Sequence, residues 1–104
     1  MRVVKEGDIR EALKARVESY GGEIRAVSWL GRRHAPDVLC LFPSGHDWFT
    51  GSPHDGRHIF VETKRPKKDA TEAQAREHAR MREAGCTVHV ITNLEELDAW
   101  LPPR

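Results

Sequence analysis

Residues 58–64 read His-Ile-Phe-Val-Glu-Thr-Lys, an apolar run that ends in a Glu-x-Lys tripeptide. A run of this length and composition is typical of a buried β-strand, and Pro66 would stop it soon afterwards. Successive side chains of a strand point to opposite faces, so Phe60, Glu62 and Lys64 would share one face. The pattern therefore predicts a strand that presents a carboxylate and an ammonium group together near its end.

A second apolar run lies upstream, where Pro36-Asp37 leads into residues 38–42, Val-Leu-Cys-Leu-Phe. Its uninterrupted apolar character is typical of a central strand. Residues 43–56 connect the two runs and are rich in Gly, Pro, Ser, Asp and His. This composition predicts a long hairpin connection or flap between two neighbouring strands.

Apolar spacing, capping residues and glycines place the remaining elements around these two strands. A helical pattern ends at Gly21-Gly22, while Thr71 and Asn93 each precede a residue pattern typical of a helix cap. The expected elements are helices over 6–20, 71–84 and 93–101, and strands over 24–29, 38–42, 58–64 and 87–91. This α-β-β-β-α-β-α order predicts an α/β fold, a small mixed sheet flanked by helices, in one domain over residues 1–104.

The composition is that of an ordinary globular chain, with 38% hydrophobic and 32% charged residues, which excludes disordered and membrane-spanning classes. Cys40 and Cys86 lack the Cys-x-x-Cys spacing of a zinc site and lie in or beside apolar runs. Buried free thiols in a reducing compartment are therefore expected. No apolar signal segment opens the chain, so we expect a cytoplasmic protein.

The net charge is only +1, from 17 Lys+Arg against 16 Asp+Glu, so bulk charge does not indicate nucleic-acid binding. Basic side chains do gather in two short segments, where each could neutralise phosphates. These nucleic-acid-binding candidates are Arg32, Arg33, His34, Arg65, Lys67 and Lys68. The alternative is two solvated turns rich in charge, which is the commoner origin of such clusters.

Asp37 and Glu62 are the candidate ligands of a divalent metal ion. If the two strands pair, both carboxylates can converge on one hard cation, and the backbone carbonyl of Thr63 could add an oxygen. Mg²⁺ and Mn²⁺ prefer such oxygen ligands. Lys64 would orient or help deprotonate a water, or stabilise transition-state charge. Taken singly, Glu62 with Lys64 is a common strand-end ion pair and Asp37 a common turn residue, so the prediction depends on their ordered combination.

That combination resembles a known family. Ala35-Pro36-Asp37, the stretch Phe-Val-Glu-Thr-Lys at 60–64, and Gln74 and His78 before Gly85 look like the virus-type replication-repair nuclease (VRR-NUC) domain of the PD-(D/E)xK superfamily. The resemblance covers nearly the whole chain. It implies a restriction-endonuclease-like core that uses Mg²⁺ or Mn²⁺ to hydrolyse DNA phosphodiesters. Stand-alone viral and bacterial members are similar to Holliday-junction resolvases and act as homodimers, which implies a branched-DNA substrate and a phage or bacterial host cell.

The family also places a metal-site glutamate on its first helix, where Glu6 and Glu11 are the candidates. At roughly 100° per residue, Glu6 falls within the apolar stripe of that helix and Glu11 points away from it. The alternative for Glu6 is a helix-start residue that favours the helix dipole. The resemblance puts Gln74 at the catalytic centre; the alternative makes it the capping-box partner of Thr71.

The chain departs from the family pattern at two places. His34 occupies the position of the glycine in a Gly-x-Pro-Asp motif, and the segment between Asp37 and Glu62 is longer than usual. In that segment Trp48 and Phe49 could wedge at a DNA branch, pack across a dimer interface or fold back on the loop, and the last two are favoured. His78 is interpreted as a packed core histidine.

Two other function classes remain open. One is a non-catalytic nucleic-acid-binding or assembly module on the same fold, against which the intact Asp37, Glu62 and Lys64 argue. The other is a transition-metal binder, although its candidate ligands are irregularly spaced in a Gly/Pro-rich loop. These ligands are His46, Asp47, His54, Asp55 and His58.

Overall fold

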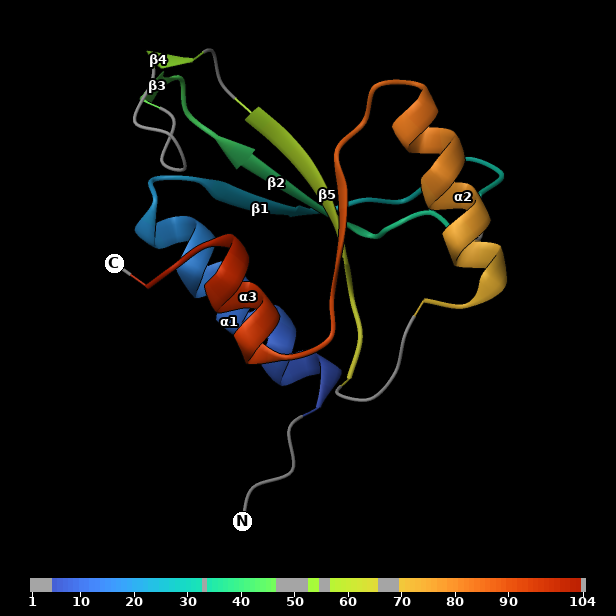
Figure 1. Ribbon diagram of the computed structural model, residues 1–104, viewed down its shortest axis with the longest axis horizontal. Coiled ribbons are helices and arrows are strands. Elements are labelled where there is room, and N and C mark those ends of the chain that lie inside the picture. Colours follow the sequence, from blue (N-terminus) through green and yellow to red (C-terminus); the bar gives the residue numbers. More distant parts are fainter. Residues whose placement is uncertain (1–4, 33, 47–52, 55–56, 66–69, 104) are drawn as a thin grey trace.

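The computed structural model describes residues 5–32, 34–46, 53–54, 57–65 and 70–103. In chain order its elements are α1 (Glu6–Ser19), β1 (Glu23–Ala26), β2 (Val38–Phe42), β3 (Gly45–His46), β4 (Pro53–His54), β5 (Arg57–Thr63), α2 (Glu72–Glu83), β6 (Val88–Ile91) and α3 (Leu94–Trp100) (Figure 1). The predicted α/β fold and its element order are confirmed. The short β3–β4 pair is an addition, because the predicted connection over 43–56 had no strands of its own.

The main sheet is mixed, as predicted, with strand order β1-β2-β5-β6. β1 and β2 are antiparallel, as are β2 and β5, whereas β5 and β6 run parallel through the crossover helix α2. β1 ends at Ala26 rather than at the expected Trp29, because its partner β2 begins only at Val38, opposite Ala26. One further bond, from Val27 N to Asp37 O at 2.9 Å, continues the pairing past the strand ends.

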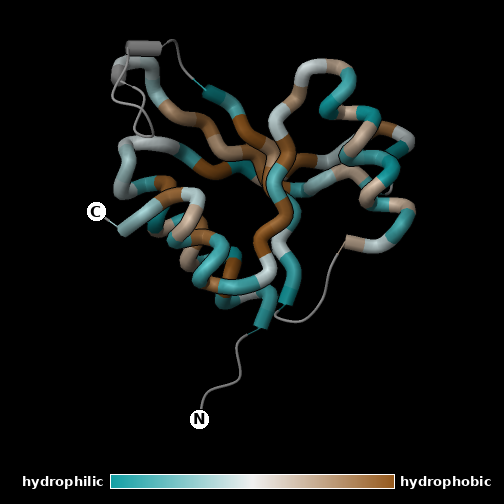
Figure 2. Tube along the Cα trace, viewed as in Figure 1, coloured by the Kyte–Doolittle hydropathy of each residue, from teal (hydrophilic) through white to brown (hydrophobic). Residues whose placement is uncertain are grey.

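Helices α1 and α3 lie together on one face of this sheet, and α2 lies on the other (Figure 1). The α1/α3 face holds the larger core, in which the apolar stripe of α1 (Ile9, Leu13 and Val17) is completely buried. Hydrophobic, brown stretches run along the strands and along α1 in the hydropathy view (Figure 2). The other buried members of this larger core are Tyr20, Val38, Cys40, Phe42, Ile59, Val61, Ile91, Leu97 and Leu101.

The α2 face holds a much smaller apolar cluster. Its buried members are Ala35, Met81 and Val88, with Trp29 and Phe60 packed against them as partly buried rings 5.3 Å apart. The indole N–H of Trp29 also donates to the backbone oxygen of Pro36 at 2.5 Å. This contact fixes the turn that leads into Asp37.

A close backbone approach explains the glycine pair after α1. A Cβ atom at Gly22 would stand 2.7 Å from the backbone oxygen of Leu41, and Gly21 has a positive φ of 79°. Only glycine meets both conditions without strain. The pair therefore lets α1 turn directly onto the sheet and brings its other end toward Asp37.

Two smaller predictions can be compared with the structure. Cys40 is fully buried and Cys86 partly buried, and both are free thiols. Burial raises the pKa of Cys40 to about 12, so that thiol is inert at neutral pH. No helix in the described part of the chain has the length and apolar character needed to cross a membrane.

Candidate active site

The candidate acidic residues meet where β2 begins and β5 ends. Val38 pairs with Val61 in the antiparallel register, so one step further Asp37 stands opposite Glu62. The side chain of Asp37 is half exposed, whereas Glu62 is only 7% exposed. The alternation predicted for the strand is present: Val61 packs in the α1/α3 core, and Glu62 faces α2.

The charge of Glu62 is destabilised by its surroundings. Its pKa is raised from 4.5 to about 7, first by burial and then by the neighbouring Asp37 carboxylate, with a further contribution from Glu6. Lys64 and Arg10 act in the opposite direction. These five groups therefore form one electrostatically coupled cluster, which contains three carboxylates and two cations.

Arg10, on α1, supplies the positive charge closest to Asp37. Its Nη2 atom lies 3.2 Å from Oδ2 and 3.5 Å from Oδ1 of Asp37, and 3.6 Å from Oε1 of Glu6. It also donates to the hydroxyl of Thr63 at 3.3 Å. Asp37 thus contacts a partner on the α1 side of the sheet, while Glu62 faces α2. Among the described residues, no three His, Cys, Asp or Glu side chains are arranged around a common metal position.

His78, on α2, is the nearest polar neighbour of Glu62. Its side chain is 1% exposed, and its Nε2 atom lies 3.6 Å from Oε1 of Glu62. Neither atom has a hydrogen-bond partner in the described structure. Burial lowers the pKa of His78, and the Arg82 charge adds to that effect, so the imidazole is neutral at pH 7. The sequence prediction of a packed histidine is correct about burial, but it missed the contact with Glu62.

Of the two candidate acids on α1, the structure brings Glu6 to the cluster. Glu6 pairs with Arg10 and contributes to the raised pKa of Glu62, whereas Glu11 lines a groove between α1 and β1. The spacing could have shown more, because Glu6, Arg10 and Lys14 follow one another at four-residue intervals and so share a helix side. Arg10 was overlooked by the sequence analysis, as was the contact of His78 with Glu62.

Two other predicted catalytic residues, Lys64 and Gln74, have structural partners in the described structure. The backbone N–H of Lys64 donates to Ile91 O at 2.9 Å, which continues the β5–β6 pairing beyond the strand end. The side-chain oxygen of Gln74 accepts from the backbone N–H of Thr71 at 2.9 Å, in the capping box of α2. The capping role of Gln74 is thus present in the structure, and its catalytic role stays a prediction.

The predicted phosphate-binding residues are less closely grouped. Arg32 lies 3.4 Å from Glu77, a carboxylate on α2 that is 6% exposed and is also held by Arg80 at 2.7 Å. The hydrogen bond from Arg80 lowers the pKa of Glu77, which keeps it ionised. His34 and Arg65 are exposed. Arg33, Lys67 and Lys68 lie outside the described residues, as do Trp48 and Phe49.

A groove of about 580 Å³ runs between α1 and β1 and reaches Asp37. Basic side chains line it (Arg10, Lys14 and Arg25), along with Glu11. Ile24, Ala26, Val27 and Val38 give it an apolar floor. The groove therefore offers positive charge and apolar surface immediately beside Asp37. The two basic segments singled out in the sequence do not line it, so the sequence analysis did not predict this surface.

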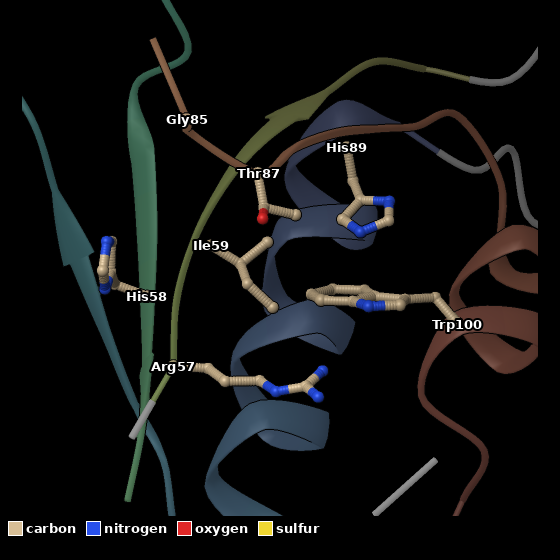
Figure 3. A pocket seen from close by; sticks show the side chains of 7 residues that line it. All are labelled: Arg57, His58, Ile59, Gly85, Thr87, His89 and Trp100. Atoms are coloured by element: carbon tan, nitrogen blue, oxygen red, sulfur yellow. The ribbon is translucent and has the colours of Figure 1, made fainter. Parts of the chain in front are cut away.

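A second hollow, of about 460 Å³, lies at the opposite end of β5. Figure 3 shows Arg57, His89 and Trp100 projecting into it, with the imidazole of His89 4.7 Å from the indole of Trp100, while the His58 side chain points away. Arg57 and Thr63 are six residues apart on β5, about 20 Å in an extended strand. This hollow is thus separate from the acidic cluster. The side chains of His46 and His54 lie outside the described part, so the histidine-rich metal site stays a prediction.

Comparisons with known proteins agree on one class. No family model matches the chain. The chain is 33% identical over 102 residues to a protein named "Putative nuclease p44" from Acyrthosiphon pisum secondary endosymbiont phage 1, and the match covers 98% of this chain and 97% of that protein. A solved structure described as a VRR_NUC domain superimposes with a TM-score of 0.73 at 33% sequence identity, covering 92% of each chain.

Proposed function

This chain belongs to the VRR-NUC nuclease family, and on that premise we propose that it is a Mg²⁺- or Mn²⁺-dependent endonuclease that hydrolyses DNA phosphodiesters. We propose further that it favours branched DNA of the Holliday-junction type and acts as a homodimer. A two-fold dimer would present two active sites to opposite strands, which symmetric cutting of a junction requires.

One observation carries the catalytic proposal. Glu62 is 7% exposed, stands opposite Asp37, and has a carboxylate oxygen, Oε1, without a hydrogen-bond partner in the described structure. A buried unpaired carboxylate costs free energy unless a cation or a donor compensates it. Proteins retain such groups where they have a function, and a strongly raised carboxyl pKa marks the same kind of place.

The chemistry of the donors fits a hard divalent ion. Asp37, Glu62 and Glu6 offer carboxylate oxygens, and Thr63 offers a backbone carbonyl, which are the ligand types that Mg²⁺ and Mn²⁺ prefer. When bound, the ion supplies Lewis acidity toward water and the scissile phosphate. Arg10 lies within 3.5 Å of both carboxylate oxygens of Asp37, so a metal ion bound there would compete with this ion pair.

The cationic side chains of the cluster then serve the substrate. Lys64 follows Glu62 by two residues, and its ammonium group is close enough to lower the pKa of that carboxyl. From there it would orient the attacking water or stabilise negative charge on the phosphate. Arg10, once it has left Asp37, stands beside the same phosphate, where a guanidinium can bind two oxygens at once.

The groove between α1 and β1 is the proposed path of the cleaved strand. It reaches Asp37, and Lys14 and Arg25 would neutralise phosphates on either side of it. Exposed His34 and Arg65, with Arg32, Arg33, Lys67 and Lys68, are proposed as further phosphate contacts. Binding would be sensitive to salt and weakly sequence-specific, because phosphates carry no sequence information.

The test compares cleavage of labelled four-way junction, duplex and single-stranded DNA in Mg²⁺ or Mn²⁺. We expect cutting that requires the metal ion, is fastest on the junction, and falls at least about a thousandfold in Asp37→Ala and Glu62→Ala, because each variant removes an assigned metal ligand. Glu6→Ala and Glu11→Ala form a matched pair on one helix, of which Glu6→Ala should lose more activity.

The outcomes separate the function classes. DNA binding without cutting, in wild type and variants alike, would support a non-catalytic module and overturn the nuclease proposal. Tight zinc retention with neither activity would favour the histidine-based metal binder. Sedimentation of the purified chain measures its mass in solution, and a monomer that still cuts junctions would overturn the dimer proposal alone.

A further inference from the structure

Two buried polar atoms face each other in the described structure without a partner. They are Oε1 of Glu62, on β5, and Nε2 of His78, on α2, at a separation of 3.6 Å. Both side chains are at least nine-tenths buried, at 9% exposure for Glu62 and 1% for His78. A buried hydrogen-bond donor or acceptor without a partner costs about 1–3 kcal/mol, and such atoms are rare in folded proteins.

This separation of 3.6 Å is about 0.6 Å longer than the usual N–H···O distance of about 3.0 Å. Their placement across the sheet–helix boundary is set by the fold, since Glu62 is fixed in the β5–β6 register and His78 lies in the middle of α2. A small rotation of the Glu62 carboxylate would close the remaining gap.

We propose that His78 is a positioning residue, whose Nε2–H holds the inner oxygen Oε1 of Glu62 and leaves the second oxygen for the divalent ion. The inference rests on the proposed function, because it needs Glu62 to be a metal ligand. Carboxylates that bind metals are themselves held by hydrogen bonds, and loss of such a bond typically costs about 10- to 100-fold in metal affinity or activity. No other described donor reaches Oε1, so His78 is the group available for this task.

His89 provides a matched control. It is a half-buried histidine on β6 that stacks on Trp100 of α3 (Figure 3), on the opposite face of the sheet from His78 and the α2-facing Glu62. A substitution there alters a histidine on the same sheet without removing the group that faces Glu62.

The experiment measures Mn²⁺ affinity by calorimetry for the full chain and for His78→Gln, His78→Leu and His89→Gln, with thermal unfolding of each. The amide nitrogen of glutamine reaches the place of Nε2 and can donate, whereas leucine has similar bulk and cannot. We expect His78→Leu to bind Mn²⁺ about 10- to 100-fold more weakly, and His78→Gln and His89→Gln to stay within about threefold of wild type.

Kinetics give a second readout. With a positioning role, excess Mn²⁺ restores most of kcat in His78→Leu and leaves KM for DNA unchanged, whereas Glu62→Gln stays inactive at any Mn²⁺ concentration. A purely structural role predicts the reverse pattern, with the apolar leucine tolerated and the buried glutamine destabilising. Should His78→Leu fail to fold, His78→Met, with a flexible apolar side chain, takes its place in the same comparison.

The results distinguish this inference from the function on which it rests. A wild-type chain that neither binds Mn²⁺ nor cuts DNA overturns the nuclease proposal, and the role of His78 with it. A wild-type chain that binds and cuts, beside a His78→Leu variant of equal Mn²⁺ affinity, overturns the inference alone. Equal loss in His78→Leu and His78→Gln also overturns it, because the hydrogen bond would then not be the cause.

Discussion

The two faces of the sheet differ in what they bury. On the α1/α3 face, the residues in contact are almost all apolar, and the side chains of Ile9, Leu13 and Val17 are completely buried. On the α2 face, the buried apolar cluster of the described residues is small (Ala35, Met81 and Val88) and lies beside the buried polar side chains of Glu62, Glu77 and His78. One face is therefore built for stability, and the other accepts costly polar burial next to the acidic cluster.

The difference has a physical basis. Apolar burial contributes roughly 25 cal/mol for each Å² removed from water, so the larger core can offset polar groups elsewhere in the domain. Buried charges need partners, and Glu77 has two arginines, but Oε1 of Glu62 and Nε2 of His78 have none in the described structure. Among the described residues, these unmatched groups lie at the end of β5 that stands opposite Asp37.

The first prediction compares truncations on the two faces. Leu13→Ala should lower the free energy of unfolding by an amount in the upper half of about 2–5 kcal/mol, because the cavity opens in the larger core. Met81→Ala should cost an amount near the lower end, since the α2 cluster is small and its neighbours can relax. Urea denaturation followed by circular dichroism measures both. Equal losses, or a larger loss at Met81, would show that the two faces contribute alike.

The second prediction concerns pH and the metal-free chain. Glu62 has a pKa of about 7 when folded against 4.5 in the reference state, so the folded chain binds more protons between these values. The contribution of Glu62 to the stability of the folded chain should therefore be highest below pH 4.5. It should fall as the pH rises from 4.5 to 7 and level off above 7. The shift in the pKa of Glu62 corresponds to a change of about 3 kcal/mol in the free energy of unfolding.

Glu62→Gln isolates that contribution, because glutamine fills the same space and does not titrate. The lowered pKa of His78 acts in the opposite direction, so the informative quantity is the difference in unfolding free energy between wild type and Glu62→Gln at each pH. We expect the unfolding free energy of Glu62→Gln to increase relative to that of wild type as the pH rises from 4.5 to 7. Above pH 7 this difference should stay constant. A difference that does not vary with pH would mean that Glu62 is well solvated in the folded chain.

The third and smallest prediction concerns Arg10, which reaches the acidic cluster from the stable face. Arg10→Gln removes the guanidinium from Asp37 and should raise the affinity for Mn²⁺ by up to about fivefold, since an exposed ion pair contributes about 0.2–1 kcal/mol. Arg25→Gln is the control, because Arg25 lines the same groove but pairs with Glu23. A weaker Mn²⁺ affinity in Arg10→Gln alone would instead mean that Arg10 helps to assemble the site.

Much of the fold follows from local patterns. The strands over 38–42 and 58–64 are recognisable because they are continuous apolar runs, and the caps at Thr71 and Asn93 are present in the structure as predicted. The prediction was less accurate for the first strand, whose end at Ala26 depends on where β2 begins. The strands of the β3–β4 pair are only two residues long, too short to produce a periodic signal.

The acidic residues of the candidate site were predictable from the sequence, whereas the residues that contact them were not. Asp37, Glu62 and Lys64 occur in a recognisable order along the chain, and helical spacing favoured Glu6 over Glu11. Arg10 and His78 were missed as site residues because each acts through a contact between distant segments: Arg10 with Asp37, and His78 with Glu62. A single sequence contains no local signal of such a contact.

The sequence alone determined the α/β element order, the presence of an aspartate before one apolar strand and a glutamate near the end of another, and the resemblance to VRR-NUC nucleases, because these depend on residue type and short-range spacing. The tertiary structure alone decided that Asp37 lies against Arg10, that Glu62 is buried with an unpaired oxygen beside His78, and that a groove reaches Asp37. Burial and ion pairing depend on which helix covers which face of the sheet, and that is settled by packing over the whole chain.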